Sequence, residues 1–362
     1  MDALTTPLNW QRVRLGDICE IVKGQQINKI SLNNTDKYPV INGGIDFLGY
    51  TNKFNVSKNT IAISEGGTCG YVRFMTSDFW SGGHNYSLQK ISNKVNNLCL
   101  YHILKSYEKD IMKLGVGSGL KNIQLKALKD FEIPLPPLNE QSAIADILSG
   151  LDRYLHALDA LILKKEGVKK ALSFELLSQR KRLRGFNQAW QRVRLGDIAN
   201  YLTSNLSAEQ ITQQGKIKVY DVNNFIGYTD TTFISDKPYI SIVKDGSVGR
   251  VRILPPKTNI LSTMGALIAN HRTTTEFLFY LLSNFDFKNF TSGNIIPHIY
   301  FKDYKEKTIF LPPLNEQSAI ANILSALDHE ITSLKNKKRQ FENIKKALNH
   351  DLMSAKIRVL KK

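Results

Sequence analysis

The sequence predicts an α+β fold in which two α/β domains, in a pseudo-two-fold arrangement, are separated by two long helices that form an antiparallel coiled coil. The nine residues WQRVRLGDI occur at 10–18 and again at 190–198. The twenty residues 133–152 return at 309–328 with 17 identities. Apolar residues that follow each of these later repeats recur with a seven-residue period. These three observations indicate a duplicated chain in which two unlike blocks alternate with two nearly identical ones.

The composition is that of a folded protein with more than one domain. A chain of 362 residues is long enough for two to three domains, and 42% hydrophobic residues argue against disorder. No apolar run approaches the roughly 20 residues of a membrane span, and the first residues lack the apolar core of a signal peptide. The three cysteines have no metal-ligand or disulfide-framework spacing, so we expect reduced thiols in a cytoplasmic protein.

The net charge is +17, from 49 Lys and Arg against 32 Asp and Glu. The excess is positive in both unlike blocks and in both repeated ones, so no single basic tail carries it. Such a distribution favours contact with a polyanion along the whole molecule.

The first unlike block, 1–137, predicts a mixed α/β domain. Short β-branched and aromatic runs, interrupted by Gly and Asn, predict strands. A longer periodic run predicts a helix, which is followed by a glycine-rich segment. The expected strands lie within 38–44, 59–67, 70–74 and 85–91, the helix within 96–114, and the glycine-rich segment at 115–123.

The second unlike block, 188–312, repeats this order with different side chains. It predicts strands within 216–229 and 239–254, a helix at 274–285, and a loop segment at 291–299. The segment 66–72 corresponds to 245–251, and 118–123 corresponds to 292–299. One scaffold therefore carries two different sets of loop residues.

The repeated blocks, 138–187 and 313–362, predict long helices. Prolines before each block end the preceding strand, and Asn139 or Asn315 is suited to cap the first turn. The apolar stripe has the 3.5-residue period of a left-handed coiled coil, interrupted by lysines such as Lys165 and Lys345. The stripe comprises Ile144, Leu148, Leu151, Leu155, Leu158, Ile162, Leu172 and Leu176, and Ile320, Leu324, Leu327, Ile331, Leu334, Phe341, Leu348 and Leu352.

The near-identity of the two helix starts suggests that both have the same ligand. We therefore predict two equivalent docking sites for a protein partner, since exposed positions with no ligand are free to differ. The alternative is an ordinary helical hairpin inside one core. The candidate partner-binding residues are Asn139, Glu140, Gln141, Asn315, Glu316 and Gln317.

Loop residues with long or planar polar side chains are the candidates for contact with nucleic acid. Arg suits guanine O6 and N7, Asn and Gln suit adenine N6 and N7, and Lys suits phosphates. The candidates are Lys23, Gln25, Gln26, Arg73, His84, Asn85, Lys121 and Asn122 in the first block, and Arg250, Arg252, His271, Arg272, Asn294 and His298 in the second.

No catalytic or metal-binding constellation is found in the sequence. It has no phosphate-binding GxxxxGK[ST] loop, no GxSxG, no HExxH and no Asn/Asp-Pro-Pro-Tyr/Phe tetrapeptide of an amino-methyltransferase. We therefore expect no catalytic residue and no metal site in this chain.

The combined pattern resembles the specificity subunit of type I restriction–modification systems over essentially the whole chain. The match rests on WxxVRLGDI at 10–18 and 190–198, and on IPLPPLNEQxxIAxIL at 133–148 with its copy at 309–324. The frame GGTCGYV, SGGHNY, SG and NI of the first block adds to it. One departure is Phe310, which stands where the first copy has Pro134.

The resemblance implies two target recognition domains, 1–137 and 188–312, each recognising one half of a bipartite double-stranded DNA target. It implies spacer helices at 138–187 and 313–362 that set the half-site spacing and dock two methyltransferase subunits, with two restriction subunits joined through them. It also implies no cofactor in this chain, with S-adenosylmethionine, ATP and Mg on the partner subunits, and a cytoplasmic place in a bacterium or archaeon.

Two other kinds of protein are alternatives to a specificity subunit. A structural adaptor would carry two protein-binding modules on a coiled-coil spacer and would bind no DNA; the spread positive charge and amide-rich loops weigh against it. The recognition half of a single-chain restriction enzyme would need a methyltransferase region, which this sequence lacks. Salt-sensitive binding to duplex DNA separates the specificity subunit from the adaptor.

Overall fold

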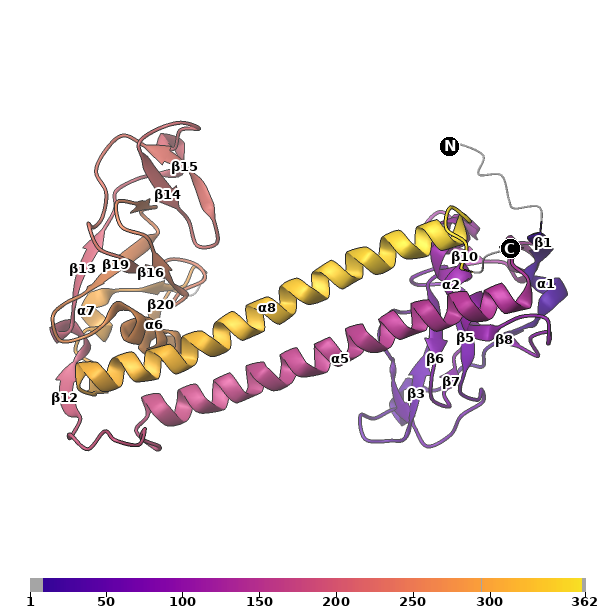
Figure 1. Ribbon diagram of the computed structural model, residues 1–362, viewed down its shortest axis with the longest axis horizontal. Coiled ribbons are helices and arrows are strands. Elements are labelled where there is room, and N and C mark those ends of the chain that lie inside the picture. Colours follow the sequence, from indigo (N-terminus) through magenta and orange to yellow (C-terminus); the bar gives the residue numbers. More distant parts are fainter. Residues whose placement is uncertain (1–8, 294, 360–362) are drawn as a thin grey trace. The chain divides into compact units, whose positions relative to one another are not determined.

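The computed structural model describes residues 9–293 and 295–359, and these divide into two compact units. Unit 1 comprises residues 1–159 and 336–362, and unit 2 comprises residues 160–335. Figure 1 shows the chain coloured from its N-terminus to its C-terminus, with many of its helices and strands labelled. Each unit therefore contains one unlike block together with a part of each long helix.

Unit 1 is built on a four-stranded antiparallel sheet with the order β2-β8-β5-β6. A three-stranded sheet, β4-β3-β7, and two strand pairs, β1-β11 and β9-β10, complete it. The strands are β1 (Gln11–Arg14), β2 (Glu20–Lys23), β3 (Tyr38–Ile41), β4 (Gly49–Thr51), β5 (Thr60–Ser64), β6 (Val72–Met75), β7 (Trp80–Ser81), β8 (Asn85–Gln89), β9 (Gly115–Val116), β10 (Asn122–Ile123) and β11 (Glu132–Leu135); the helices are α1 (Leu15–Ile18), α2 (Asn97–Ser106), α3 (Glu108–Lys113) and α4 (Leu125–Lys129), with a 3-10 turn at Lys29–Ser31.

Unit 2 repeats this topology strand for strand. Its four-stranded sheet has the order β13-β19-β16-β17, its three-stranded sheet the order β15-β14-β18, and its pairs are β12-β22 and β20-β21. The strands are β12 (Gln191–Arg194), β13 (Ala199–Thr203), β14 (Ile217–Tyr220), β15 (Phe225–Thr229), β16 (Tyr239–Val243), β17 (Val251–Leu254), β18 (Asn259–Ile260), β19 (Met264–Ala269), β20 (Thr291–Ser292), β21 (His298–Ile299) and β22 (Thr308–Leu311); the helices are α6 (Thr275–Ser283) and α7 (Phe301–Tyr304), with 3-10 turns at Leu195–Asp197, Ala208–Gln210 and Lys288–Phe290.

One capped helix packs on the four-stranded sheet of each unit. Asn96 accepts a hydrogen bond from the Cys99 amide at 3.0 Å and begins α2, and Thr274 accepts one from the Phe277 amide at 3.2 Å and begins α6. Leu100 and Ile103 of α2 belong to the same buried cluster as Ile61 and Leu88 of the sheet. The predicted helix 96–114 is interrupted at Tyr107, where α2 ends and α3 follows.

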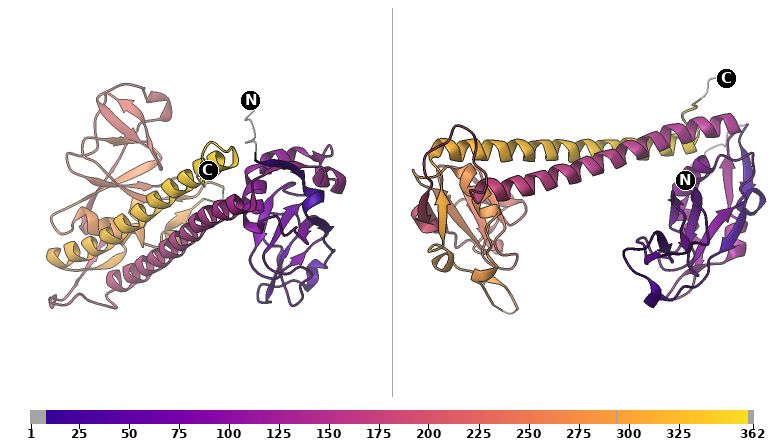
Figure 2. Two further views of the ribbon diagram at one scale, coloured as in Figure 1. Left: turned by 45° about the vertical axis from the view of Figure 1, so that its right-hand side comes forward. Right: turned by 90° about the horizontal axis from the view of Figure 1, so that it is seen from below.

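The long helices are α5 (Leu138–Leu177) and α8 (Leu314–Met353), each of 40 residues. In unit 1, Asp159 pairs with Lys338 at 2.6 Å and Asp152 pairs with Lys345, so numbers rising along α5 meet numbers falling along α8. This is antiparallel pairing, and Figure 2 gives two further views of it. The Tyr154 and Phe341 rings, with centroids 4.7 Å apart, pack beside these ion pairs.

Unit 2 contains the same antiparallel arrangement with the two helices exchanged. Lys165 pairs with Glu330 at 2.8 Å and Lys169 with Asp328 at 2.5 Å. The lysines that interrupt the apolar stripe are therefore the residues that form ion pairs between the helices. None of the predicted stripe residues is exposed, and Leu148 and Leu324 are fully buried.

The predicted fold class is confirmed: the chain is α+β, with two α/β domains of one topology and two long helices that pair antiparallel. The predicted boundaries at 137, 187 and 312 stay a prediction. No helix among the residues that the structure describes is long and apolar enough to cross a membrane.

Candidate nucleic-acid interface

In unit 1, five of the predicted contact residues lie around one buried carboxylate, that of Glu65. Lys23 is the last residue of β2, and its Nζ is 2.6 Å from Glu65 Oε1. His84 precedes β8, and its Nδ1 is 3.7 Å from Glu65 Oε2. Hairpin β9-β10 brings Lys121 and Asn122 to the same place, because the Ile123 amide donates to the Glu65 carbonyl at 2.9 Å. The Gln26 amide lies against Gly83, next to His84.

Glu65 was not among the predicted residues, although it directly follows β5 and immediately precedes a pair of glycines. Its side chain is almost completely buried, and Oε1 also accepts a hydrogen bond from the Tyr86 hydroxyl at 3.4 Å. Burial, together with the Glu65 charge, raises the pKa of Tyr86 to about 12, so Tyr86 stays a donor. Glu65 Oε2 is buried and has no hydrogen-bond partner among the residues that the structure describes.

Glycine makes this close approach of loops feasible. Gly43 has φ of +82°, and a Cβ there would lie 2.5 Å from the Gly66 carbonyl oxygen. A Cβ on Gly66 would lie 2.3 Å from Asn122 Oδ1. Three loops therefore pack backbone against backbone at the end of β5, and their polar side chains gather there.

The equivalent loops of unit 2 carry different chemistry. The Ile299 amide donates to the Lys244 carbonyl at 2.9 Å, just as Ile123 does to Glu65, so Lys244 occupies the position of Glu65. Beside it, Asp245 Oδ1 is 2.6 Å from His298 Nδ1. Of the predicted residues, His298 lies at this place, while Asn294 lies outside the described residues.

Arg73 and Arg252 occupy equivalent positions in β6 and β17 and are used internally. Arg73 donates to the carbonyl oxygens of the β3–β4 loop, at Gly44 and Ile45, and its guanidinium lies over the Phe47 ring. Arg252 donates to the Asn223 carbonyl of the β14–β15 loop at 2.9 Å. Each arginine thus holds a hairpin of the three-stranded sheet in place.

The side chains of the remaining predicted contact residues form no hydrogen bond or ion pair with Glu65 or Lys244 within the part of the chain that the structure describes. Asn85 is 2% exposed, and its amide donates to Ser81 Oγ and to the Tyr86 carbonyl, both at 3.1 Å. His271 and Arg272 lie before α6, where the Arg272 carbonyl accepts from the Gln317 amide. Gln25 is an exposed residue of the loop after β2, where its amide donates to the Ser81 carbonyl, and Arg250 is an exposed residue just before β17.

The repeated motif at the helix starts forms an internal joint. Glu140 is 2% exposed; Trp10 Nε1 donates to its Oε2 at 3.3 Å, and Arg358 donates to both oxygens at 2.7 and 2.9 Å. In unit 2 the fully buried Glu316 accepts in the same way from Trp190 Nε1 at 3.0 Å and from Arg182 at 2.7 and 3.2 Å. The repeated Trp and the repeated Glu are therefore partners.

Gln141 joins the start of α5 to the loop before α2, and Gln317 joins the start of α8 to the loop before α6. Gln141 Nε2 donates to the Pro136 carbonyl at 2.7 Å, and its Oε1 accepts from the Asn96 amide at 2.7 Å. Gln317 repeats both bonds with Pro312 and Thr274. Asn139 and Asn315 remain exposed, and each Oδ1 accepts from the next backbone amide at 2.9 Å.

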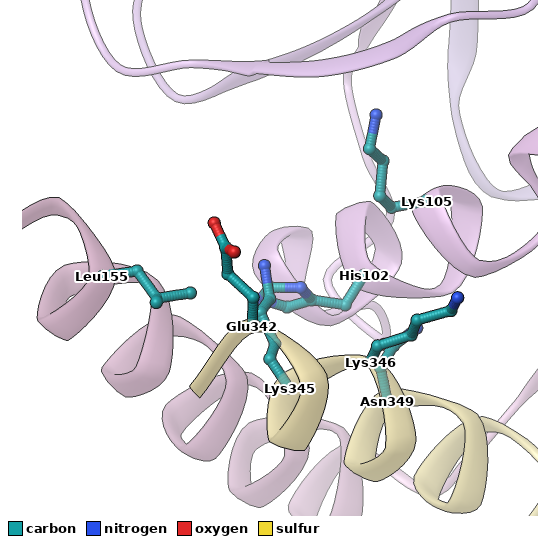
Figure 3. A pocket seen from close by; sticks show the side chains of 7 residues that line it. All are labelled: His102, Lys105, Leu155, Glu342, Lys345, Lys346 and Asn349. Atoms are coloured by element: carbon teal, nitrogen blue, oxygen red, sulfur yellow. The ribbon is translucent and has the colours of Figure 1, made fainter. Parts of the chain in front are cut away.

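The helices α2 and α6 also contact the helix pair through one polar residue each. His102 Nε2 lies 3.3 Å from Ser149 Oγ, and burial lowers the His102 pKa to about 4, so the ring is neutral at neutral pH. Tyr280, its counterpart, donates to Asp328 Oδ2 at 2.9 Å. Figure 3 shows the pocket of about 360 Å³ between His102, Leu155 of α5 and Lys345 of α8.

Among the residues that the structure describes, neither this pocket nor the loop clusters form a metal site. Within residues 9–293 and 295–359, no group of three or more His, Cys, Asp or Glu side chains is placed to hold a metal ion. The chemistry that the arrangement offers is hydrogen bonding and charge at the ends of the loops.

Comparison with known proteins gives a consistent result along the chain. A family model described as the type I restriction modification DNA specificity domain matches residues 7–165 and 187–343. A Mycoplasma genitalium protein named as a candidate type I specificity subunit is 32% identical over 69% of this chain and 68% of its own length. The MjaVIII type I restriction enzyme specificity subunit of Methanocaldococcus jannaschii is 25% identical over 99% of this chain and 95% of its own. The crystal structure of a type I restriction–modification system S subunit from M. genitalium superimposes with a TM-score of 0.73 at 27% identity, over 96% of this chain and 97% of that one.

Proposed function

Since this chain belongs to the type I restriction–modification DNA specificity family, we propose that it is the subunit that selects the DNA sequence, and that each unit recognises one half of a bipartite target. The observation that carries this proposal is the pair of loop clusters around Glu65 and Lys244. One scaffold presents an acidic residue beside Lys23, His84 and Asn122 in unit 1, and Lys244 beside Asp245 and His298 in unit 2. Different donors and acceptors in one frame suit different base edges.

Positive charge supports binding to the DNA backbone. Lys and Arg exceed Asp and Glu by 17 over the chain, and the exposed Lys23 and Lys121 lie in the loop cluster of unit 1. Contacts to phosphates would give most of the affinity and make it fall steeply with salt, whereas base contacts would give the specificity. Duplex DNA binding measured between about 50 and 200 mM salt tests this part of the proposal, and salt-independent binding or none contradicts it.

The long helices are proposed to set the separation of the two half-sites. Each helix of 40 residues has a contour of about 60 Å, while half-sites on one face of B-DNA lie about 34 Å apart. In unit 1, the ion pairs between the helices use residues of α5 no later than Asp159 and residues of α8 no earlier than Lys338. In unit 2, they use residues of α5 from Lys165 onward and residues of α8 up to Lys335. Added residues between these points would leave every such ion pair in place.

A four-residue insertion after Asp159 in α5, matched by one after Lys335 in α8, is therefore expected to lengthen the gap between the half-sites. Four residues add about 6 Å of helix, which corresponds to one to two base pairs at 3.4 Å each. The motif modified by the assembled enzyme should keep both half-sites and gain that spacing. Insertion into α8 alone serves as the control, because it breaks the register of the pair. An unchanged gap in an active, doubly extended protein would refute the role of the helices.

Docking of the modification subunits is proposed at the exposed part of the two helix starts. The buried glutamate and glutamine side chains are used inside each unit, so they act by shaping the surface. Leu138 and Asn139 in one copy, and Leu314 and Asn315 in the other, are exposed and identical. Two identical surfaces fit two copies of one methyltransferase subunit, and restriction subunits would join through those copies.

The chain by itself is expected to be catalytically inactive. The purified chain, incubated with duplex DNA, S-adenosylmethionine, ATP and Mg²⁺, should neither methylate nor cleave, because the proposed chemistry and cofactors belong to the partner subunits. Transfer of labelled methyl groups to DNA is the measurement, with the assembled enzyme as the positive control. Methyl transfer by the isolated chain would contradict this assignment.

A further inference from the structure

Glu65 directly follows β5 in unit 1, and Lys244 directly follows β16 in unit 2. These two residues occupy the same backbone position in the two units. The Glu65 amide donates to the His84 carbonyl at 2.9 Å, and its carbonyl accepts from the Ile123 amide. The Lys244 amide donates to the Thr263 carbonyl at 3.1 Å, and its carbonyl accepts from the Ile299 amide. The backbone is thus fixed identically, while the side chain changes from an acceptor to a donor.

The Glu65 carboxylate is also incompletely satisfied. One oxygen accepts from Lys23 Nζ and the Tyr86 hydroxyl, and the other, Oε2, is buried without a hydrogen-bond partner among the described residues. The Nδ1 atom of the exposed His84 ring lies 3.7 Å from Glu65 Oε2, which is beyond hydrogen-bond distance. An unpaired buried acceptor is unfavourable, so a donor brought by a ligand at this loop cluster would be bound selectively.

We propose that this position determines base specificity, with Glu65 accepting from an exocyclic base amino group and Lys244 donating to guanine. The amino groups that a carboxylate selects in the major groove are cytosine N4 and adenine N6, whereas a lysine selects guanine O6 and N7. The inference rests on the proposed function and adds to it the residue that distinguishes the two half-sites. Neither Glu65 nor Lys244 was singled out by the sequence pattern.

The test uses the full chain assembled with its modification subunits and a pool of DNA duplexes with randomised half-sites. The bound fraction is sequenced for the wild type, Glu65→Gln and Lys244→Gln, because glutamine has the size of glutamate and is an uncharged polar replacement at both positions. Glu65→Gln is expected to weaken the preference for one base pair in one half-site by about tenfold, and Lys244→Gln to do so in the other half-site only. The wild-type base at the affected position distinguishes cytosine from adenine.

Glu20→Gln is the matched control, since it makes the same substitution at an exposed carboxylate that begins β2 and pairs with Lys90 outside the loop cluster. It should bind the same motif as the wild type. The inference is overturned if Glu65→Gln leaves every base frequency unchanged, if it weakens all positions equally, or if Glu20→Gln shifts the same position. A wild type that selects no motif would instead contradict the proposed function, so the two failures are distinguishable.

Discussion

Replacing residues 190–312 with the corresponding block of another family member is expected to change one half of the recognised DNA sequence and to leave the other half intact. The block begins and ends in the strand pair β12-β22, where Gln191 faces Leu311, so its two ends lie side by side. The exchanged piece therefore carries its own sheet and loop cluster and rejoins α8 at the same point. The motif modified by the assembled enzyme, determined by sequencing methylated DNA, measures the outcome.

The expected effect of the exchange is large because specific binding exceeds non-specific binding by about 10³–10⁷. The original half-site should lose nearly all preference, and the half-site of the donor protein should replace it. Exchange of a block with identical loop residues but altered sheet surface is the control and should preserve the motif. An exchange that alters both half-sites, in a folded protein, would show that the units do not recognise DNA independently.

Glu316→Ala is expected to destabilise unit 2 and leave unit 1 unaffected. The substitution removes the only acceptor that the buried Trp190 indole has among the residues that the structure describes, which costs about 1–3 kcal/mol, and leaves the Arg182 guanidinium without its carboxylate. Hydrogen exchange measured by mass spectrometry should accelerate within residues 160–335. Glu140→Ala should produce the converse pattern, because Trp10 and Arg358 surround that carboxylate in unit 1.

The matched control for this pair is Glu330→Ala on the same helix as Glu316. Glu330 is exposed and pairs with Lys165 at the surface, so its loss is expected to change stability by less than about 1 kcal/mol. Equal acceleration for Glu316→Ala and Glu330→Ala would contradict the buried joint. Acceleration spread over both units after Glu316→Ala would contradict the independence of the units.

The duplication and the helices could be predicted because their signals are local and repeated. Leu148 and Leu324 lie in a seven-residue apolar period, and a period identifies a buried face without knowledge of its partner. The strands near Ile61 and Ile240 could also be predicted, since short β-branched runs between glycines are characteristic of strands. The break of the first predicted helix at Tyr107 had no proline or glycine to indicate it.

The roles of the candidate site residues were harder to predict from the sequence, because identity between the two repeats does not show whether a residue is exposed or buried. Glu140 and Gln141 are repeated as would be expected of a shared docking surface, yet they are buried and bonded within the unit. Arg358 aligns with Arg182 by the same offset of 176 that relates Glu316 to Glu140, and this signal could have indicated the joint. Glu65 and Lys244 differ in charge, so a search for shared residues overlooks them.

Methylome sequencing of the source organism, with and without this gene, tests the central claim most directly. The account predicts methylated adenine in one bipartite motif, with two defined half-sites separated by a gap of fixed length at which any base is tolerated. That methylation should disappear when the gene is deleted and return when it is restored. A motif without a gap, or the same methylation in cells that lack the gene, would contradict the assignment of one half-site to each unit.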